Sequence, residues 1–92
     1  MEEKIRTLHP DGKKGVHISK AKYETMKKTI LDVLAKGGLT HNELTAAVLK
    51  KLQGKFEGSI PWYMEGTKLD LEARGVIERA PGEKYETYRV KR

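Results

Sequence analysis

Residues 59–75 read SIPWYMEGTKLDLEARG, and this run has the marks of one helix with a defined beginning and end. Ser59 is a residue type whose side-chain oxygen accepts a hydrogen bond from a free N–H of the first helical turn. Pro61 falls in that first turn, where its missing donor costs nothing. Gly75 is the residue type that ends a helix in a left-handed conformation. The sequence therefore predicts a helix between Ser59 and Gly75.

The apolar side chains of this predicted helix fall on two opposite sides. At about 100° per residue, a narrow arc holds Trp62, Gly66, Leu69 and Ala73. We expect that arc to face the protein core, with Trp62 as its anchor. Met64 and Leu71 lie on the opposite side, and two large apolar groups there need a cover. Either an N-terminal arm packs over them, or they form a dimer or partner interface.

Two further helices are expected before residue 59. Residues 19–35 repeat apolar side chains at three- and four-residue spacing, which predicts a first helix. Thr40 and Glu43 form a capping box, which predicts the start of a second helix. The linker of residues 53–58 is longer than the turn of a simple helix-turn-helix and fits its winged variants.

A β-hairpin is expected after the third helix. Residues 76–80 and 85–90 read as two strands around the turn residues Pro81 and Gly82. Three helices followed at once by a hairpin predict an α+β fold of the winged helix-turn-helix class, with the C-terminal hairpin as the wing.

An N-terminal arm, residues 1–18, is expected to precede the winged-helix domain, residues 19–92. Residues 10–12 read Pro-Asp-Gly, which is strong turn chemistry, so the arm is extended or forms a hairpin. A metal site with the ligands His9, Asp11 and His17 is the alternative interpretation of this segment. Two histidines and one carboxylate on a flexible turn lack a further firm ligand, so we expect no metal there.

The composition narrows the function classes. The chain has 92 residues, a net charge of +6 and no cysteine, which excludes disulfides, thiolate catalysis and cysteine-ligated zinc. No apolar run approaches the roughly 20 residues that cross a bilayer, and no secretion signal is evident, so we expect a cytoplasmic protein without membrane contact. The histidines and carboxylates show no catalytic spacing, so we expect no enzyme, no cofactor and no small-molecule substrate.

Several segments resemble known proteins. Trp62 and Leu69, followed by residues 71–79 (LEARGVIER) and 88–90 (YRV), stand in an order similar to the N-terminal winged-helix domain of Mrr-type restriction proteins. Three other segments are similar to small uncharacterised bacterial winged-helix proteins, namely residues 7–12 (TLHPDG), 55–59 (KFEGS) and 69–75 (LDLEARG). The Mrr resemblance implies DNA binding by analogy of fold. Cleavage does not carry over, because the resemblance does not include the nuclease half of those proteins.

Duplex DNA binding is the function that this analogy favours. In a winged helix the third helix enters the major groove, while the wing and helix N-termini contact phosphates. The expected DNA contacts are Lys55, Ser59, Tyr63, Thr67, Lys68, Arg74, Arg79, Lys84 and Arg89. Residues 59–75 carry a net charge of −1, whereas residues 19–36 and 76–92 carry +3 and +2. We therefore expect weak, salt-sensitive or dimer-dependent binding.

The alternative function is a protein-interaction or dimerisation module with no DNA role. Its interface would contain Met64 and Leu71, if the arm leaves them uncovered. The partners that the sequence allows are thus duplex DNA, a second copy of the chain or another protein.

Overall fold

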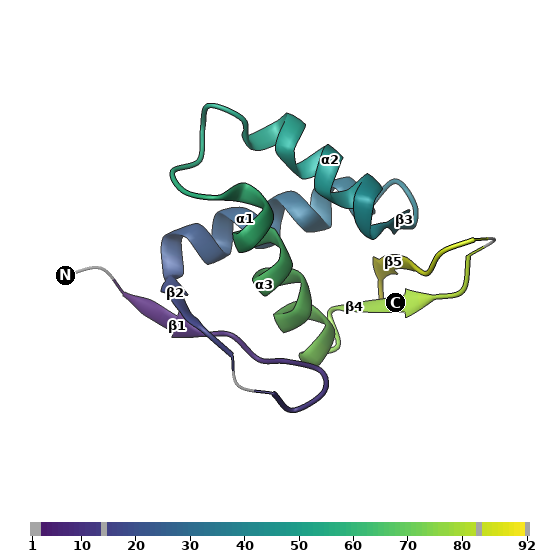
Figure 1. The fold of residues 1–92 in the computed structure, drawn as a ribbon, viewed down its shortest axis with the longest axis horizontal. Helices are drawn as coiled ribbons and strands as arrows, with labels where there is room; N and C mark the ends of the chain where they lie inside the picture. Colours follow the sequence, from purple (N-terminus) through teal and green to yellow (C-terminus); the bar gives the residue numbers. More distant parts are fainter. Residues whose placement is uncertain (1–2, 14, 83, 92) are drawn as a thin grey trace.

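Three helices form the centre of the molecule in the computed structural model, which describes residues 3–13, 15–82 and 84–91 (Figure 1). They are α1 (Lys20–Leu34), α2 (His41–Leu52) and α3 (Ile60–Ala73). Each begins where the sequence predicts it, because a capping side chain accepts a hydrogen bond from a first-turn N–H. The caps are Ser19, Thr40 and Ser59, and Thr40 with Glu43 forms the predicted capping box. The local start signals are therefore confirmed.

Short strands form two antiparallel sheets in the described part of the chain. Strands β1 (Lys4–Arg6) and β2 (His17–Ser19) make a hairpin within the arm. The second sheet has the order β3 (Leu39–Thr40), β5 (Thr87–Val90) and β4 (Ile77–Ala80). Both predicted hairpins are confirmed, whereas sequence analysis missed β3, a strand of two residues between α1 and α2.

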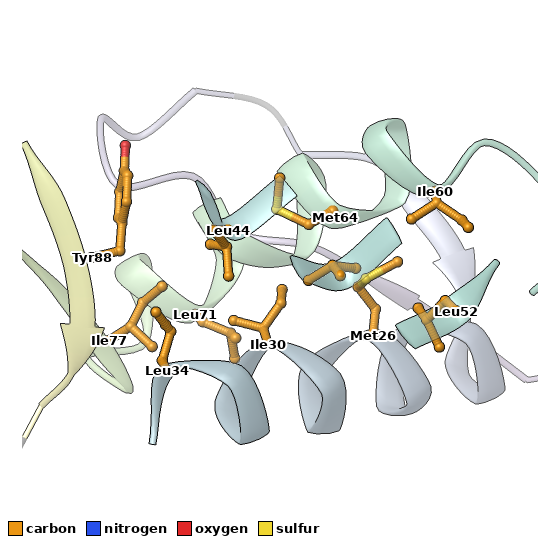
Figure 2. Close-up of a cluster of buried hydrophobic side chains, with 11 residues drawn as sticks. Met26, Ile30, Leu34, Leu44, Leu52, Ile60, Met64, Leu71, Ile77 and Tyr88 are labelled. Carbon is orange, nitrogen blue, oxygen red and sulfur yellow. The ribbon is translucent and has the colours of Figure 1, made fainter. Parts of the chain in front are cut away.

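The core lies between the three helices and is closed at one end by the β4–β5 hairpin (Figure 2). Its buried side chains are Met26, Ile30 and Leu34 of α1, Leu44, Val48 and Leu52 of α2, Ile60, Met64 and Leu71 of α3, and Ile77 and Tyr88 of the hairpin. Every helix contributes one apolar stripe to this cluster, as amphipathic helices around a common core do.

Helix α3 is turned by about half a revolution from the orientation that the sequence predicts. Trp62, the expected core anchor, is 51% exposed, whereas Met64 and Leu71 are 1% and 0% exposed. The assignment of Trp62 to the core is therefore wrong, and so is the prediction that Met64 and Leu71 form a partner interface. The physical reason is a second apolar stripe, in which Ile60 joins Met64 and Leu71 at helical spacing. These long aliphatic side chains, and not Trp62, pack against α1 and α2.

The arm joins the helices through hydrogen bonds. Thr7 N donates to the Val16 carbonyl at 2.8 Å, and Val16 N donates to Thr7 Oγ1 at 3.0 Å, so pairing extends beyond β1 and β2. Leu8 N donates to Asp70 Oδ1 of α3 at 2.8 Å. The predicted turn at residues 10–12 is present. The arm is thus fastened to the side of α3.

These elements establish an α+β fold with three helices and small antiparallel sheets among the described residues. The winged-helix class remains a prediction. Within the same residues, no helix combines the length and apolar character needed to cross a membrane.

Candidate interaction surface

Two of the predicted DNA contacts are buried by the orientation of α3. Thr67 is 0% exposed and Lys68 is 3% exposed, so the prediction that they reach DNA is wrong. Lys68 Nζ lies 3.0 Å from His41 Nδ1 and 4.2 Å from the ring centroid of Tyr88, between α2 and β5. The Thr67 hydroxyl has no hydrogen-bond partner among the described residues. Both side chains therefore belong to the packing of α3 against its neighbours.

Three other predicted contacts are exposed arginines that already bind carboxylates. Arg74, Arg79 and Arg89 pair with Asp70, Glu72 and Glu78 respectively. Arg74 Nε lies 2.9 Å and 3.0 Å from the two Asp70 oxygens, and Arg89 Nε lies 2.7 Å from Glu78 Oε2. Hydrogen bonding to Asp70 raises the pKa of Arg74, and hydrogen bonding to Glu72 raises the pKa of Arg79. Each pairing largely cancels the charge that a phosphate would sense.

The remaining predicted contacts lie at two separate places. Lys55 belongs to the loop between α2 and α3, Ser59 caps α3, and Tyr63 stands in the first turn of that helix. Lys84 belongs to the turn of the β4–β5 hairpin. This hairpin lies on the side of the molecule opposite the loop between α2 and α3 (Figure 1). Ser59 and Tyr63 thus share the first turn of α3, Lys55 lies in the loop before it, and Lys84 lies apart, while their role in DNA binding stays a prediction.

Aromatic rings gather at the N-terminal end of α3. The Tyr63 ring meets Phe56 and Trp62 edge-on, at centroid distances of 5.2 Å and 4.9 Å. Lys22 Nζ of α1 lies 5.1 Å from the Tyr63 centroid, which is a cation–π distance. Gly58, at φ +114°, passes so close that a Cβ there would lie 2.9 Å from Tyr63. These contacts fix Tyr63, which in turn supports one edge of the Trp62 indole.

The outer face of α3 carries the apolar residues that sequence analysis placed in the core. We call them the Trp62 stripe, which consists of Trp62, Gly66, Leu69 and Ala73. Trp62 is half exposed and the other three are partly exposed. A Cβ at Gly66 would meet no atom within 4 Å, so the stripe is open at its middle. Glu65 beside it is exposed and has no ion pair in the described part of the chain.

A hollow of about 450 Å³ lies at the Ala73 end of the Trp62 stripe. It opens between α3 and the arm, and its lining includes Arg6, Leu8, Pro10, Lys13 and Ala73. The Leu8 side chain is exposed. Arg6 and Lys13 are also exposed, and neither has an ion pair within the described residues. The hollow therefore combines an apolar lining with a basic rim.

A buried carboxylate holds the arm beside this hollow. Asp70 is fully buried and accepts hydrogen bonds from Leu8 N, from the Tyr23 hydroxyl of α1 and from Arg74 Nε. Burial, and then the hydrogen bond to Asp70, raise the pKa of Tyr23 to about 12, so the hydroxyl stays a donor at neutral pH. Sequence analysis missed this group because Leu8 and Tyr23 are 62 and 47 positions away from Asp70 in the chain.

The described residues contain no group of three His, Asp or Glu side chains placed to hold a metal ion. The fold and its exposed features describe a small α+β protein with an open apolar helix face. Residues 4–88 match the model of a protein family described as a family of unknown function (DUF6958). The chain therefore belongs to this family. Comparisons with curated proteins and with solved structures give no match.

Proposed function

We propose that this chain is a protein-interaction module on a winged-helix scaffold, with the Trp62 stripe as its binding surface. The order of helix, short strand, two helices and hairpin from α1 to β5 supports the winged-helix assignment. In DNA-binding proteins of that class, the outer face of the third helix enters the major groove. Here the same face is apolar, which favours a protein partner.

The exposure of Trp62 carries this proposal. Contiguous apolar surface that is left in water marks interaction sites, and tryptophan is enriched among the residues that dominate the binding energy of interfaces. Trp62 is 51% exposed, and its ring meets the Tyr63 ring edge-on. A partner that covers the indole removes this apolar surface from water.

The charges around α3 support the same choice. Lys68 is buried and Arg74 is bound to Asp70, so the outer face presents no unpaired cation in the described part of the helix. Glu65 is exposed there. An acidic group near a phosphate subtracts from the electrostatic attraction that supplies most non-specific DNA affinity. A major-groove contact through this face is therefore disfavoured.

A photoreactive side chain at position 66 tests the proposal in cells. Gly66 lies on open surface, so a large side chain fits, and irradiation couples it to any protein in contact with the Trp62 stripe. A matched control carries the same side chain at Ala46, an exposed position of α2. We expect a protein adduct from position 66 and none from position 46. No adduct from position 66, or equal yields from both positions, contradict the proposal.

Duplex DNA binding is a second candidate, because three lysines border one groove between α1 and α2. Lys36, Lys50 and Lys51 line this groove together with Asp32, and none of the lysines has an ion pair within the described residues. The net charge of +6 and the resemblance to Mrr-type domains favour this candidate. Such lysines would contact phosphates and so would bind without reading sequence.

A salt titration of binding to random duplex DNA tests the second candidate. We expect binding at low salt that falls steeply as the salt concentration rises. The double variant Lys50→Ala, Lys51→Ala should reduce the salt slope by about 2, because two phosphate contacts are lost. Lys84→Ala, at the hairpin tip, should change it less. An affinity that salt leaves unchanged, or no binding at low salt, excludes DNA as the ligand.

A further inference from the structure

We infer that the groove between α1 and α2 binds an acidic peptide segment of a partner protein, which seats a large apolar side chain between three lysines. We call this site the lysine groove. Its floor consists of Val33, Leu39 and Ala47, and its rim of Lys36, Lys50 and Lys51. The groove is formed by α1, β3 and α2, whereas the Trp62 stripe belongs to α3, so this inference goes beyond the proposed function.

The floor of the lysine groove is apolar and open. Val33 of α1 and Leu39 of β3 are partly buried and pack against the core. Ala47 of α2 lines the same floor, and its side chain is a single methyl group. The groove has a volume of about 450 Å³, which lies within the roughly 300–1,000 Å³ of ligand-binding clefts. An apolar side chain that fills this space is removed from water together with the floor.

The rim of the lysine groove is positively charged. Lys36 follows the C-cap of α1, and Lys50 and Lys51 belong to the last turn of α2. All three are exposed, and none has an ion pair within the described residues. A helix C-terminus carries only about half a negative charge, so it offsets these cations in part. Three lysines and one carboxylate, Asp32, leave the lining with a formal charge of +2.

An acidic peptide uses both the floor and the rim, whereas DNA uses only the rim. Phosphates would satisfy the lysines, but the sugar–phosphate backbone has no apolar side chain to place on the floor. In a peptide, carboxylates on either side of a large apolar residue would meet the lysines while that residue covers the floor. The charges then orient the peptide, and the apolar contact adds affinity. The groove therefore fits an acidic peptide better than a nucleic acid.

Selection from a displayed library of random peptides tests this inference without knowledge of the partner. The library is first depleted on the variant Ala47→Arg, which fills the floor and keeps the lysines. This step removes peptides that bind elsewhere, including at the Trp62 stripe, so the result does not depend on the proposed function. The remaining peptides are selected on the intact wild-type chain. We expect the enriched peptides to combine an excess of Asp and Glu with at least one large apolar residue.

The most enriched peptide then serves as the probe for variants, with fluorescence polarisation as the measurement. Ala47→Arg should weaken its binding at least tenfold, although the added positive charge alone would strengthen it. The matched control Ala46→Arg adds the same charge at an exposed position of α2 and should not weaken binding. The double variant Lys50→Glu, Lys51→Glu should weaken binding at least tenfold, because it reverses the charge of the rim.

Thermal unfolding of the variants shows whether they are folded. If Ala47→Arg does not fold, the double variant replaces it in the depletion, because both of its positions are exposed. Salt provides a further measurement. At about 1 M salt, where charges are screened beyond about 3 Å, the peptide should bind more weakly but still measurably, since the apolar contact remains.

Three results would overturn the inference. They are no enriched peptide after depletion, enriched peptides without an excess of acidic residues, and equal affinity of the probe for wild type and a folded Ala47→Arg variant. Random duplex DNA is the competing ligand. If no peptide is enriched and Ala47→Arg binds this DNA more tightly than wild type does, the lysines bind phosphates and the peptide site is excluded.

Discussion

The inner and outer faces of α3 carry similar amounts of apolar side chain, yet they have opposite environments. Ile60, Met64 and Leu71 on the inner face pack into the core, whereas Trp62 and Leu69 on the outer face contact solvent. A helix with two opposed apolar stripes satisfies the helical period in either orientation, so periodicity cannot choose between them. The choice is made by the shape of the space that the other helices leave.

The aliphatic side chains of the inner face fit the core better than Trp62 does, because they are flexible. Ile60, Met64 and Leu71 reach between α1 and α2, and unbranched methionine adapts to irregular gaps. A buried Trp62 would need a hydrogen-bond acceptor for its indole N–H, which water supplies when the ring is exposed. The inner orientation has a cost as well, since it buries the Thr67 hydroxyl without a hydrogen-bond partner in the described structure.

The largest difference in stability is expected between two alanine variants, one on each face of α3. Leu71→Ala should lower the free energy of unfolding by about 2–5 kcal/mol, because it leaves a cavity among three helices. Trp62→Ala should lower it by less than about 1 kcal/mol at concentrations where the chain is monomeric. Urea unfolding measures both values.

A surface leucine supplies the control for this contrast. Leu49→Ala removes the same atoms as Leu71→Ala at an exposed position of α2, and should have a small effect. Equal losses for Trp62→Ala and Leu71→Ala would mean that the outer face also belongs to the core.

A change on the flank of α3, between its two faces, should have an intermediate effect on stability. Asp70 lies there, and Tyr23→Phe removes one of its hydrogen-bond donors, which should cost about 1–3 kcal/mol of stability at neutral pH.

The pKa of Tyr23 rises from 10.0 in the unfolded chain to about 12 in the fold. As the pH increases, the unfolded chain therefore loses this proton first. The stability from the buried hydroxyl is complete below pH 10 and is lost as the pH approaches 12, by up to about 2.7 kcal/mol.

The difference between wild type and Tyr23→Phe isolates this titration from that of the other tyrosines and lysines. Unfolding free energies of both proteins between pH 8 and 12 should converge above about pH 10. A difference that stays constant over this range would show that the fold does not raise the pKa of Tyr23.

The smallest expected effect is a gain in stability from a substitution on the inner face of α3. Thr67→Val keeps the shape of the side chain and removes a buried hydroxyl that lacks a partner, so it should stabilise the domain by about 0.5–1 kcal/mol. Thr45→Val on α2 is the matched control, because the Thr45 hydroxyl donates to the His41 carbonyl at 2.8 Å. Thermal unfolding should rank the Thr67 variant above wild type and the Thr45 variant below it; the reverse order would mean that Thr67 has an acceptor after all.

The sequence predicted the features that depend on neighbouring residues. The caps at Ser19, Thr40 and Ser59, the turn at residues 10–12 and the left-handed Gly75 all arise within a few positions. It could not predict β3, because two residues form a strand only by pairing with β5.

The candidate site was predicted less well, because its contacts join residues that are distant in the sequence. Arg79 pairs with Glu72 across the junction between α3 and β4, and Lys68 meets His41 on another helix. The sizes of the side chains do distinguish the two stripes of α3. The stripe that begins at Ile60 holds three large aliphatic residues, whereas the Trp62 stripe contains two small ones, Gly66 and Ala73.

The hydrogen bond from Leu8 N to Asp70 has a consequence for the order of folding. Its partners are separated by 62 positions, so it closes a long loop, and we expect it to form after α1 and α3 have assembled around the carboxylate. The arm is therefore expected to dock last and to detach first. Hydrogen exchange at the Leu8 amide would follow this local opening separately from the global unfolding of the three helices.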